Sequence, residues 1–235
     1  MPKILIWESL AILAGGQKVA LQIADAVKQK SDCIFIIPAE GPLSLELKKR
    51  NIKYYVLDIG QYSIGEKRFT DILRYFFKTP KIFISAYKII KREKVQLIYV
   101  NAARNFIWSA LLGNITSIPV IWHVHNFFKD SKTKFLINIA GKFRSVKKIV
   151  FVSDTVRQHL PSLKYKSDVV SNGIDMSKFE FSHNGKSQIR KEFGIPNDTK
   201  IISTIGWMMP SKRQDILLKA IPSILNFNKN IHFLI

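Results

Sequence analysis

The sequence predicts an α/β protein built on a doubly wound parallel sheet. Short apolar runs alternate with amphipathic stretches along most of the chain, which is typical of strands followed by crossover helices. The runs are continuously apolar, as strands covered on both faces are. With 235 residues, of which 47% are hydrophobic and 23% charged, the chain can bury a sizeable core and is not disordered. No run reaches the roughly 18–20 apolar residues of a membrane span.

Residues 1–175 are expected to form the first Rossmann-like domain. Apolar runs predict seven strands, at Lys3–Trp7, Cys33–Ile37, Lys53–Leu57, Leu97–Asn101, Val120–His125, Lys148–Val152 and Asp168–Ser171. Helical spacing predicts the intervening helices, at about residues 17–30, 43–51, 68–94, 104–112, 131–144 and 154–160. Pro80 is expected to break the segment 68–94 into two pieces.

The pattern changes after Asp175. Residues 176–199 are polar and predict a connection with a short helix at Gln188–Phe193. Residues 200–235 then predict one strand–helix–strand unit, with its helix from Lys212 to about Phe227. Such a unit cannot cover its own apolar surfaces, and the chain stops inside an apolar strand. We therefore expect the incomplete start of a second Rossmann-like domain, in the N-terminal part of a longer protein.

The formal charge of +20 comes from 37 Lys and Arg against 17 Asp and Glu. Nucleic acid, an anionic membrane surface or acidic substrates could each account for it, and so could a lysine-rich composition without function. The single cysteine, Cys33, excludes an internal disulfide, and the N-terminus does not look like a signal peptide. A cytoplasmic location fits both observations.

Two segments concentrate the positive charge. Residues 67–94 carry nine basic and two acidic residues, and residues 129–148 carry seven basic residues and Asp130. Both contain aromatic side chains, a combination that suits an anionic membrane surface. The alternative is that the aromatic side chains pack on the sheet while the lysines are solvated.

Ligands of such sheets bind in the loops that follow the strands. Gly15 and Gly16 follow the first strand and would let a ligand approach the start of a helix, although they do not form a dinucleotide fingerprint. A tight turn that needs positive φ is the alternative. In the fifth strand, alternation places His123 and His125 on one face, with His125 at the carboxyl end. No nearby acidic residue or cysteine completes a metal site, so a polar contact from His125 to a ligand is favoured over a structural role.

Two later loops carry further candidates. Asn172 and Gly173 predict a turn at the mouth of an interdomain cleft. Gly206, Lys212 and Arg213 open the predicted helix of the second domain, where a helix N-terminus and two cations would suit a diphosphate. The alternative there is an ordinary solvated Lys-Arg pair.

These features occur in a fixed order along nearly the whole chain. They are Gly15-Gly16, His125, Val152-Ser153-Asp154, Ser171-Asn172-Gly173-Ile174-Asp175, Ile205-Gly206 and Pro210-Ser211-Lys212. As an ordered set they resemble the family 4 glycosyltransferases, which have the GT-B fold of two facing Rossmann-like domains. No single motif is decisive.

The resemblance implies a retaining, metal-independent hexosyltransferase that moves a sugar from a UDP- or GDP-linked donor to a lipid-linked or polysaccharide acceptor in cell-surface glycan synthesis. It implies an acceptor-side domain at residues 1–175 and a donor-binding domain from residue 200. His125 would contact the transferred sugar as the catalytic residue, and Gly15 and Gly16 would approach the donor phosphates or the acceptor.

The remaining residues that the resemblance implies lie at the donor diphosphate and at the domain junction. Gly206, Lys212 and Arg213 would bind the diphosphate, and Lys212 would neutralise its charge as it leaves. Ser153, Asn172, Gly173 and Asp175 would line the junction.

The implied location is peripheral, on the cytoplasmic face of the plasma membrane. No cofactor, metal or specific nucleic acid is expected.

Two departures from the family pattern stand out. Trp207 occupies the position where the family usually has arginine, and Arg213 could supply the missing cation. The family's later pair of glutamates is not in this sequence, so we expect little or no turnover from this chain alone.

Two other classes remain open. A basic polyanion-binding α/β module without catalysis would use the high charge, but no nucleic-acid-binding signature is present. A nicotinamide-dependent enzyme would need a glycine fingerprint and an acidic residue after the second strand, where Pro38 stands. The sequence does not name the sugar, the nucleotide or the acceptor.

Overall fold

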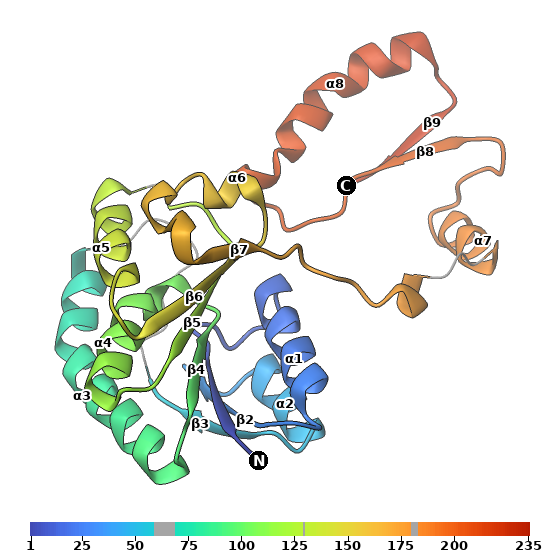
Figure 1. Ribbon diagram of the computed structural model, residues 1–235. Helices are drawn as coiled ribbons and strands as arrows, with labels where there is room; N and C mark the ends of the chain where they lie inside the picture. The colour runs from blue at the N-terminus through green and yellow to red at the C-terminus, as the bar shows by residue number, and fades with distance from the viewer. Residues whose placement is uncertain (59–68, 129, 180–182) are drawn as a thin grey trace. The chain divides into compact units, whose positions relative to one another are not determined.

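A computed structural model describes residues 1–58, 69–128, 130–179 and 183–235 (Figure 1). The chain divides into two compact units, Met1–Gly173 and Ile174–Ile235. Within the described residues, no helix is both long and apolar enough to cross a membrane.

The first unit contains a seven-stranded, wholly parallel sheet with the strand order β3-β2-β1-β4-β5-β6-β7. The doubly wound sheet predicted from the apolar runs is therefore confirmed. The strands are β1 (Lys3–Trp7), β2 (Asp32–Ile37), β3 (Lys53–Val56), β4 (Leu97–Val100), β5 (Val120–Val124), β6 (Val146–Phe151) and β7 (Ser167–Val169).

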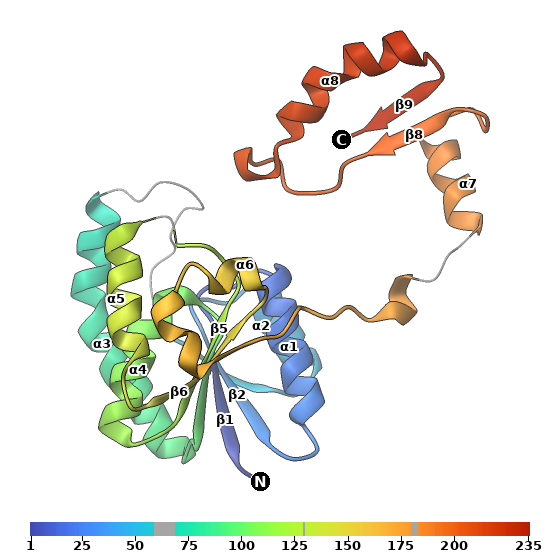
Figure 2. The same ribbon diagram turned by 45° about the horizontal axis from the view of Figure 1, so that its top comes forward.

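Helices cover both faces of this sheet (Figure 2). On one face lie α1 (Gly15–Val27) and α2 (Pro42–Lys49), whose apolar side chains pack on Ile6, Phe35 and Ile37. On the other face lie α3 (Phe69–Glu93), α4 (Phe106–Thr116) and α5 (Ser131–Gly141), around a larger core that includes Trp7 and Trp122. Three shorter helices, η1 (Ala103–Asn105), α6 (Asp154–Arg157) and η2 (Pro161–Lys166), complete the unit.

The predicted break at Pro80 is wrong. The α3 helix runs continuously through this residue. Pro80 is exposed, so the backbone carbonyl that loses its helical N–H partner can meet water. Beyond it, Ala86, Ile89 and Ile90 are buried in the core and hold the second half of the helix on the sheet.

The order of the strands reverses between β1 and β4. After β1 the chain adds β2 and β3 on one side, and it then crosses over to add β4 on the other side. Such a switch point leaves a crevice beyond the carboxyl ends of the two central strands. Trp7 pairs with Val100 in the sheet, so the next residues, Glu8 and Asn101, leave it side by side.

The second unit contains β8 (Lys200–Ser203) and β9 (Ile231–Leu234), a parallel pair joined through α8 (Gln214–Phe227). This agrees with the predicted strand–helix–strand unit. The α8 helix begins two residues later than predicted, because Pro210–Lys212 forms a separate 3-10 turn, η4, and Arg213 has a left-handed φ of 55°. The connection contains η3 (Met176–Phe179) and α7 (His183–Glu192), the latter longer than predicted.

Candidate functional site

Polar side chains gather at the switch point of the first unit. Glu8 follows β1, Asn101 follows β4 and His125 follows β5. Because these three strands are neighbours and parallel, their carboxyl ends meet at the same edge of the sheet. The first turn of α1 adds Gly16 and Gln17 to the same place.

Glu8 is the buried centre of this cluster. Its Oε2 accepts a hydrogen bond of 2.8 Å from Gln17 Nε2, and its Oε1 accepts one of 2.7 Å from Asn101 Nδ2. Complete burial raises its pKa from 4.5 to about 7, although both amide hydrogen bonds favour the charged form. The main chain of Glu8 is held as well, because its N–H donates to Ile36 and its carbonyl accepts from the Asn105 side chain.

Asn101 connects Glu8 to His125. Its Nδ2 also donates to the carbonyl of Gly16 at 2.8 Å, while its Oδ1 lies 2.7 Å from His125 Nε2. A methyl group added at Gly16 would lie 3.4 Å from Asn101 Nδ2 and 3.9 Å from the His125 ring. A larger residue at position 16 would therefore crowd this link. Burial lowers the pKa of the half-buried His125, which favours its neutral form.

His123 lies beneath His125, with ring centroids 4.1 Å apart. Both histidines therefore share one face of β5, as alternation predicts. Burial, together with the neighbouring His125, lowers the pKa of His123 to about 3. Its Nδ1 is 2.5 Å from the Tyr99 hydroxyl, and its buried Nε2 has no hydrogen-bond partner among the described residues. Across the same residues, no group of three His, Cys, Asp or Glu side chains could hold a metal ion.

The cluster therefore combines a neutral imidazole with a carboxyl group that titrates near neutral pH. The half-buried His125 ring can exchange hydrogen bonds with hydroxyl groups, which are the main functional groups of sugars, whereas the fully buried Glu8 carboxyl group is held by Gln17 and Asn101. Sequence reasoning found His125 and Gly16 but missed Glu8, Asn101 and Gln17. The available signal was a polar residue directly after each of the apolar runs at Lys3–Trp7 and Leu97–Val100.

Gly15 and Gly16 form the first turn of α1. The alternative of a positive-φ turn is wrong, because neither glycine has a left-handed φ. The carbonyl of Gly16 belongs to the polar cluster, whereas a side chain at Gly15 would meet nothing within 4 Å.

The predicted junction residues have local roles in the structure. Ser153 caps α6, since its hydroxyl accepts from the Val156 N–H at 3.3 Å. The turn predicted at Asn172 and Gly173 is absent: residues 170–175 run without a turn, because this pair permits a turn but does not require one. Asp175 accepts from the N–H and the hydroxyl of Ser177.

Gly206, Lys212 and Arg213 lie in the second unit. An added side chain at Gly206 would meet the aliphatic stem of Lys212 at 3.7 Å, so these two residues are neighbours. Lys212 is exposed, and Arg213 is paired with Asp215, with Nε and Oδ1 3.2 Å apart.

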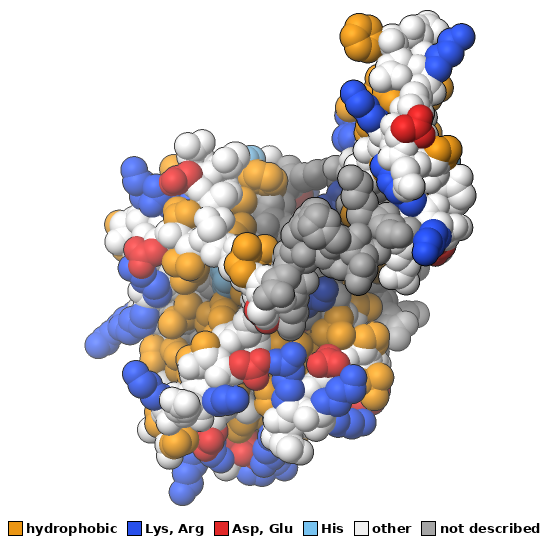
Figure 3. Space-filling view, turned by 90° about the vertical axis from the view of Figure 1, so that its right-hand side faces the viewer, with side chains coloured by type: hydrophobic (Ala, Val, Ile, Leu, Met, Phe, Trp, Pro, Cys, Tyr) orange, Lys and Arg blue, Asp and Glu red, His pale blue; other side chains and the backbone are white. Residues whose placement is uncertain are grey.

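The two basic segments differ in the structure. Lys67 and Arg68 lie outside the described residues, as do the side chains of the first half of α3. In its second half, Phe83 and Tyr87 pack against the core, so the alternative of sheet-packed aromatic side chains holds there. Figure 3 shows Lys and Arg side chains of the described residues scattered over one face, with hydrophobic side chains between them.

In α5, by contrast, apolar side chains are exposed. Three of its apolar side chains face solvent, with exposed fractions of 64% for Phe135, 50% for Leu136 and 45% for Ile139. They lie at helical spacing on one stripe, and exposed Lys132 and Lys142 occupy its two ends. We call these five residues the α5 stripe.

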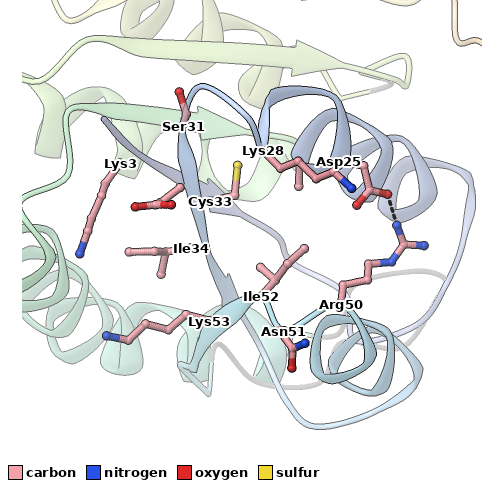
Figure 4. Close-up of a pocket in the computed structure, with 12 residues that line it drawn as sticks. Lys3, Asp25, Lys28, Ser31, Cys33, Ile34, Arg50, Asn51, Ile52 and Lys53 are labelled. Carbon is pink, nitrogen blue, oxygen red and sulfur yellow. Dashed lines mark hydrogen bonds and ion pairs between the residues drawn. The ribbon is translucent and has the colours of Figure 1, made fainter. Parts of the chain in front are cut away.

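A cavity of about 460 Å³ opens at the opposite edge of the sheet, near the amino ends of β1, β2 and β3 (Figure 4). Three of the four cations in its lining are paired locally: Arg50 pairs with Asp25, and Lys3 and Lys53 pair with Glu93. Burial raises the pKa of the Cys33 thiol in its lining to about 11, which keeps the thiol protonated. The cavity lies at the amino ends of the strands and the polar cluster at their carboxyl ends, so the two are separate.

The first unit is a doubly wound α/β domain with a polar cluster at its switch point, and a strand–helix–strand unit follows it in the chain. Residues 14–178 match the profile of Glycosyltransferase Family 4. The chain belongs to this family.

The chain is also similar to a curated enzyme and to a solved structure. Over 231 residues the chain is 21% identical to the UDP-Gal:alpha-D-GlcNAc-diphosphoundecaprenol alpha-1,3-galactosyltransferase of Escherichia coli, covering 93% of this chain and 57% of the enzyme. The crystal structure of Anabaena Alr3699/HepE in complex with UDP and glucose superposes with a TM-score of 0.77 at 18% identity, covering all of this chain and 61% of HepE. The chain thus spans less than two thirds of either relative.

The MurG structure from Acinetobacter baumannii is more distant. It matches with a TM-score of 0.59 at 16% identity, over all of this chain and 67% of MurG. These structures share the GT-B fold with this chain.

Proposed function

We propose that this chain serves a retaining, metal-independent hexosyltransferase that moves a sugar from a UDP-sugar to a lipid-linked acceptor. The polar cluster of Glu8, Asn101 and His125 at the switch point is the observation that carries the proposal. The neutral imidazole of His125 lies where open α/β sheets bind ligands, and Asn101 links it to the buried carboxyl group of Glu8.

The relatives support the choice of substrates. HepE is crystallised with UDP and glucose, and the Escherichia coli enzyme is named for a UDP-galactose donor and a diphosphoundecaprenol-linked acceptor. In this proposal Met1–Gly173 forms the acceptor side and contributes His125, which contacts the transferred sugar. Ile174–Ile235 contributes to the donor side, where Lys212 neutralises the diphosphate as it leaves. Arg213 is a second cation there, in a family that usually has arginine where Trp207 stands.

A transfer assay on the full product of the gene tests this function. Radiolabelled UDP-galactose and UDP-glucose are offered with a polyprenol-diphosphate-linked sugar, with and without EDTA. We expect lipid-linked product that keeps the donor's anomeric configuration, unaffected by EDTA, and a loss of about 100-fold or more in His125→Ala. Leu45→Ala, an exposed position on α2, is the control. Full transfer by His125→Ala, or product with inverted configuration, would contradict the proposal.

We further propose that the α5 stripe holds the protein on an anionic membrane, where a lipid-linked acceptor is available. Phe135, Leu136 and Ile139 would insert among the headgroups, and Lys132 and Lys142 would attract anionic lipid. In this proposal the enzyme is peripheral, on the cytoplasmic face of the plasma membrane.

Vesicle flotation of the chain tests membrane binding. Binding to phosphatidylglycerol vesicles is expected to exceed binding to neutral phosphatidylcholine vesicles. The double variant Phe135→Ser, Leu136→Ser should weaken it about 10-fold or more, while Leu45→Ser, with a similarly exposed leucine, should not. Equal binding by the double variant would exclude the α5 stripe. Salt-sensitive binding to duplex DNA without vesicle binding would instead favour the polyanion-binding module.

A further inference from the structure

The side-chain amide of Asn101 can take only one orientation in this structure. Its Nδ2 faces two acceptors, the Glu8 carboxylate at 2.7 Å and the Gly16 carbonyl at 2.8 Å. Turning the amide over would place its oxygen against the Gly16 carbonyl, which cannot donate a hydrogen bond in any protonation state of Glu8. The Asn101 oxygen must therefore face His125.

This orientation decides which nitrogen of His125 carries the proton. The Oδ1 atom of Asn101 only accepts hydrogen bonds, and it lies 2.7 Å from His125 Nε2. His125 must therefore donate from Nε2. In the neutral ring, the other nitrogen, Nδ1, then carries a lone pair.

We propose that Asn101, oriented by Glu8 and Gly16, is a positioning residue that holds His125 as the Nε2–H tautomer, so that Nδ1 accepts a hydrogen bond from a substrate hydroxyl. The role of the hydroxyl rests on the proposed function, whereas the tautomer is a property of the chain itself. Asn101 and Glu8 act through His125 and need not touch substrate.

Gln17 allows the hydrogen bonds from Asn101 to Glu8 and His125 to stay the same when Glu8 gains or loses a proton. The Oε1 atom of Gln17 is buried and has no hydrogen-bond partner among the described residues, while its Nε2 donates to Glu8. When Glu8 is protonated, rotating the Gln17 amide lets this oxygen accept the new proton. The Glu8 oxygen that accepts from Asn101 is not disturbed, so the same His125 tautomer is held in both states.

Nitrogen-15 NMR of histidine side chains in the 235-residue chain tests the tautomer without any substrate. The resonances of His125 are identified by their loss in His125→Gln. In the wild-type chain we expect a protonated Nε2 and an unprotonated Nδ1, in a ratio of at least about 10 to 1 over the opposite tautomer, because the opposite tautomer would leave a buried acceptor unpaired. Wild-type His125 found with its proton on Nδ1 would overturn the proposal, whatever the behaviour of the Asn101 and Glu8 variants.

Variants separate positioning from a general structural role. Asn101→Leu removes the amide that accepts from His125 Nε2 and should turn the single tautomer into a mixture. Glu8→Gln keeps an acceptor for Asn101 and should retain the wild-type tautomer. Asn114→Leu, which removes an amide from the exposed end of α4, is the matched control and should also retain it. An unchanged tautomer in folded Asn101→Leu would refute the role of Asn101.

The outcome also separates this inference from the proposed function. A fixed tautomer in a protein that transfers no sugar would leave the positioning role in place and remove the proposed activity. If sugar transfer depends on His125 but the tautomer is not fixed, the proposed activity stands and the positioning role of Asn101 is refuted.

Discussion

Replacing Glu8 by glutamine tests whether the buried carboxyl group at the switch point costs stability when it ionises. Glutamine has the same shape and keeps an oxygen for Asn101 Nδ2. Its new amide group can donate to the Gln17 oxygen that has no partner among the described residues, once the Gln17 amide rotates. Glu8→Gln should therefore fold with the cluster intact but without a group that ionises.

The pH dependence of the free energy of unfolding follows, in sign and size, from the pKa of Glu8, which burial raises from 4.5 to about 7. The folded state then holds the Glu8 proton more tightly than the unfolded state does. As the pH rises from about 4.5 to 7, the unfolded chain ionises first and the free energy of unfolding falls. At about 1.4 kcal/mol for each pH unit, ionisation costs the folded state about 3 kcal/mol in total, most of which appears between pH 5 and pH 8.

Urea unfolding of the wild-type chain and of Glu8→Gln at pH 5 and pH 8 measures this cost. We expect the variant to gain about 2–3 kcal/mol relative to wild type between the two pH values. The matched control is Glu93→Gln. Hydrogen bonds, first from Lys53 and then from Tyr55, lower the pKa of Glu93 to about 2, so its contribution is lost only below about pH 4.5 and its variant should show nearly the same difference at pH 5 and 8. A difference between Glu8→Gln and wild type that does not change with pH would refute the raised pKa of Glu8.

Three further predictions concern the packing and the site. Gly113→Ala should lower the free energy of unfolding by about 1–3 kcal/mol, because the new methyl group would lie 2.5 Å from Val120 Cγ2; Gly15→Ala, which faces open space, should change it by less than about 1 kcal/mol in the same urea titration. Ser153→Ala should lower the free energy of unfolding by about 1 kcal/mol through loss of the α6 cap. A raised KM for the donor in the folded variant would show that Ser153 does more than cap the helix. His123 should remain neutral from pH 8 down to about pH 4, and a titration midpoint near 6.5 in the NMR spectrum would contradict its burial.

The sequence anticipated two of the five residues of the polar cluster, His125 and Gly16. His125 could be predicted because alternation placed it at the carboxyl end of an apolar strand, and Gly16 because a double glycine followed the first strand. Glu8 and Asn101 also follow strands, but a polar residue after a strand is common and does not by itself indicate a functional site. Their partnership joins residues 93 positions apart, and it depends on β1 and β4 being neighbours.

The sequence by itself determined which segments become strands and helices, because continuous apolar runs and helical spacing are local properties of the chain. Only the tertiary structure decided that α3 passes through Pro80, that Phe83 packs partly buried against the core while Phe135 is exposed, and which way the Asn101 amide faces. Each of these depends on neighbours supplied by distant segments. Burial by those segments also shifts the pKa of Glu8, which in an open chain would be an ordinary carboxylate.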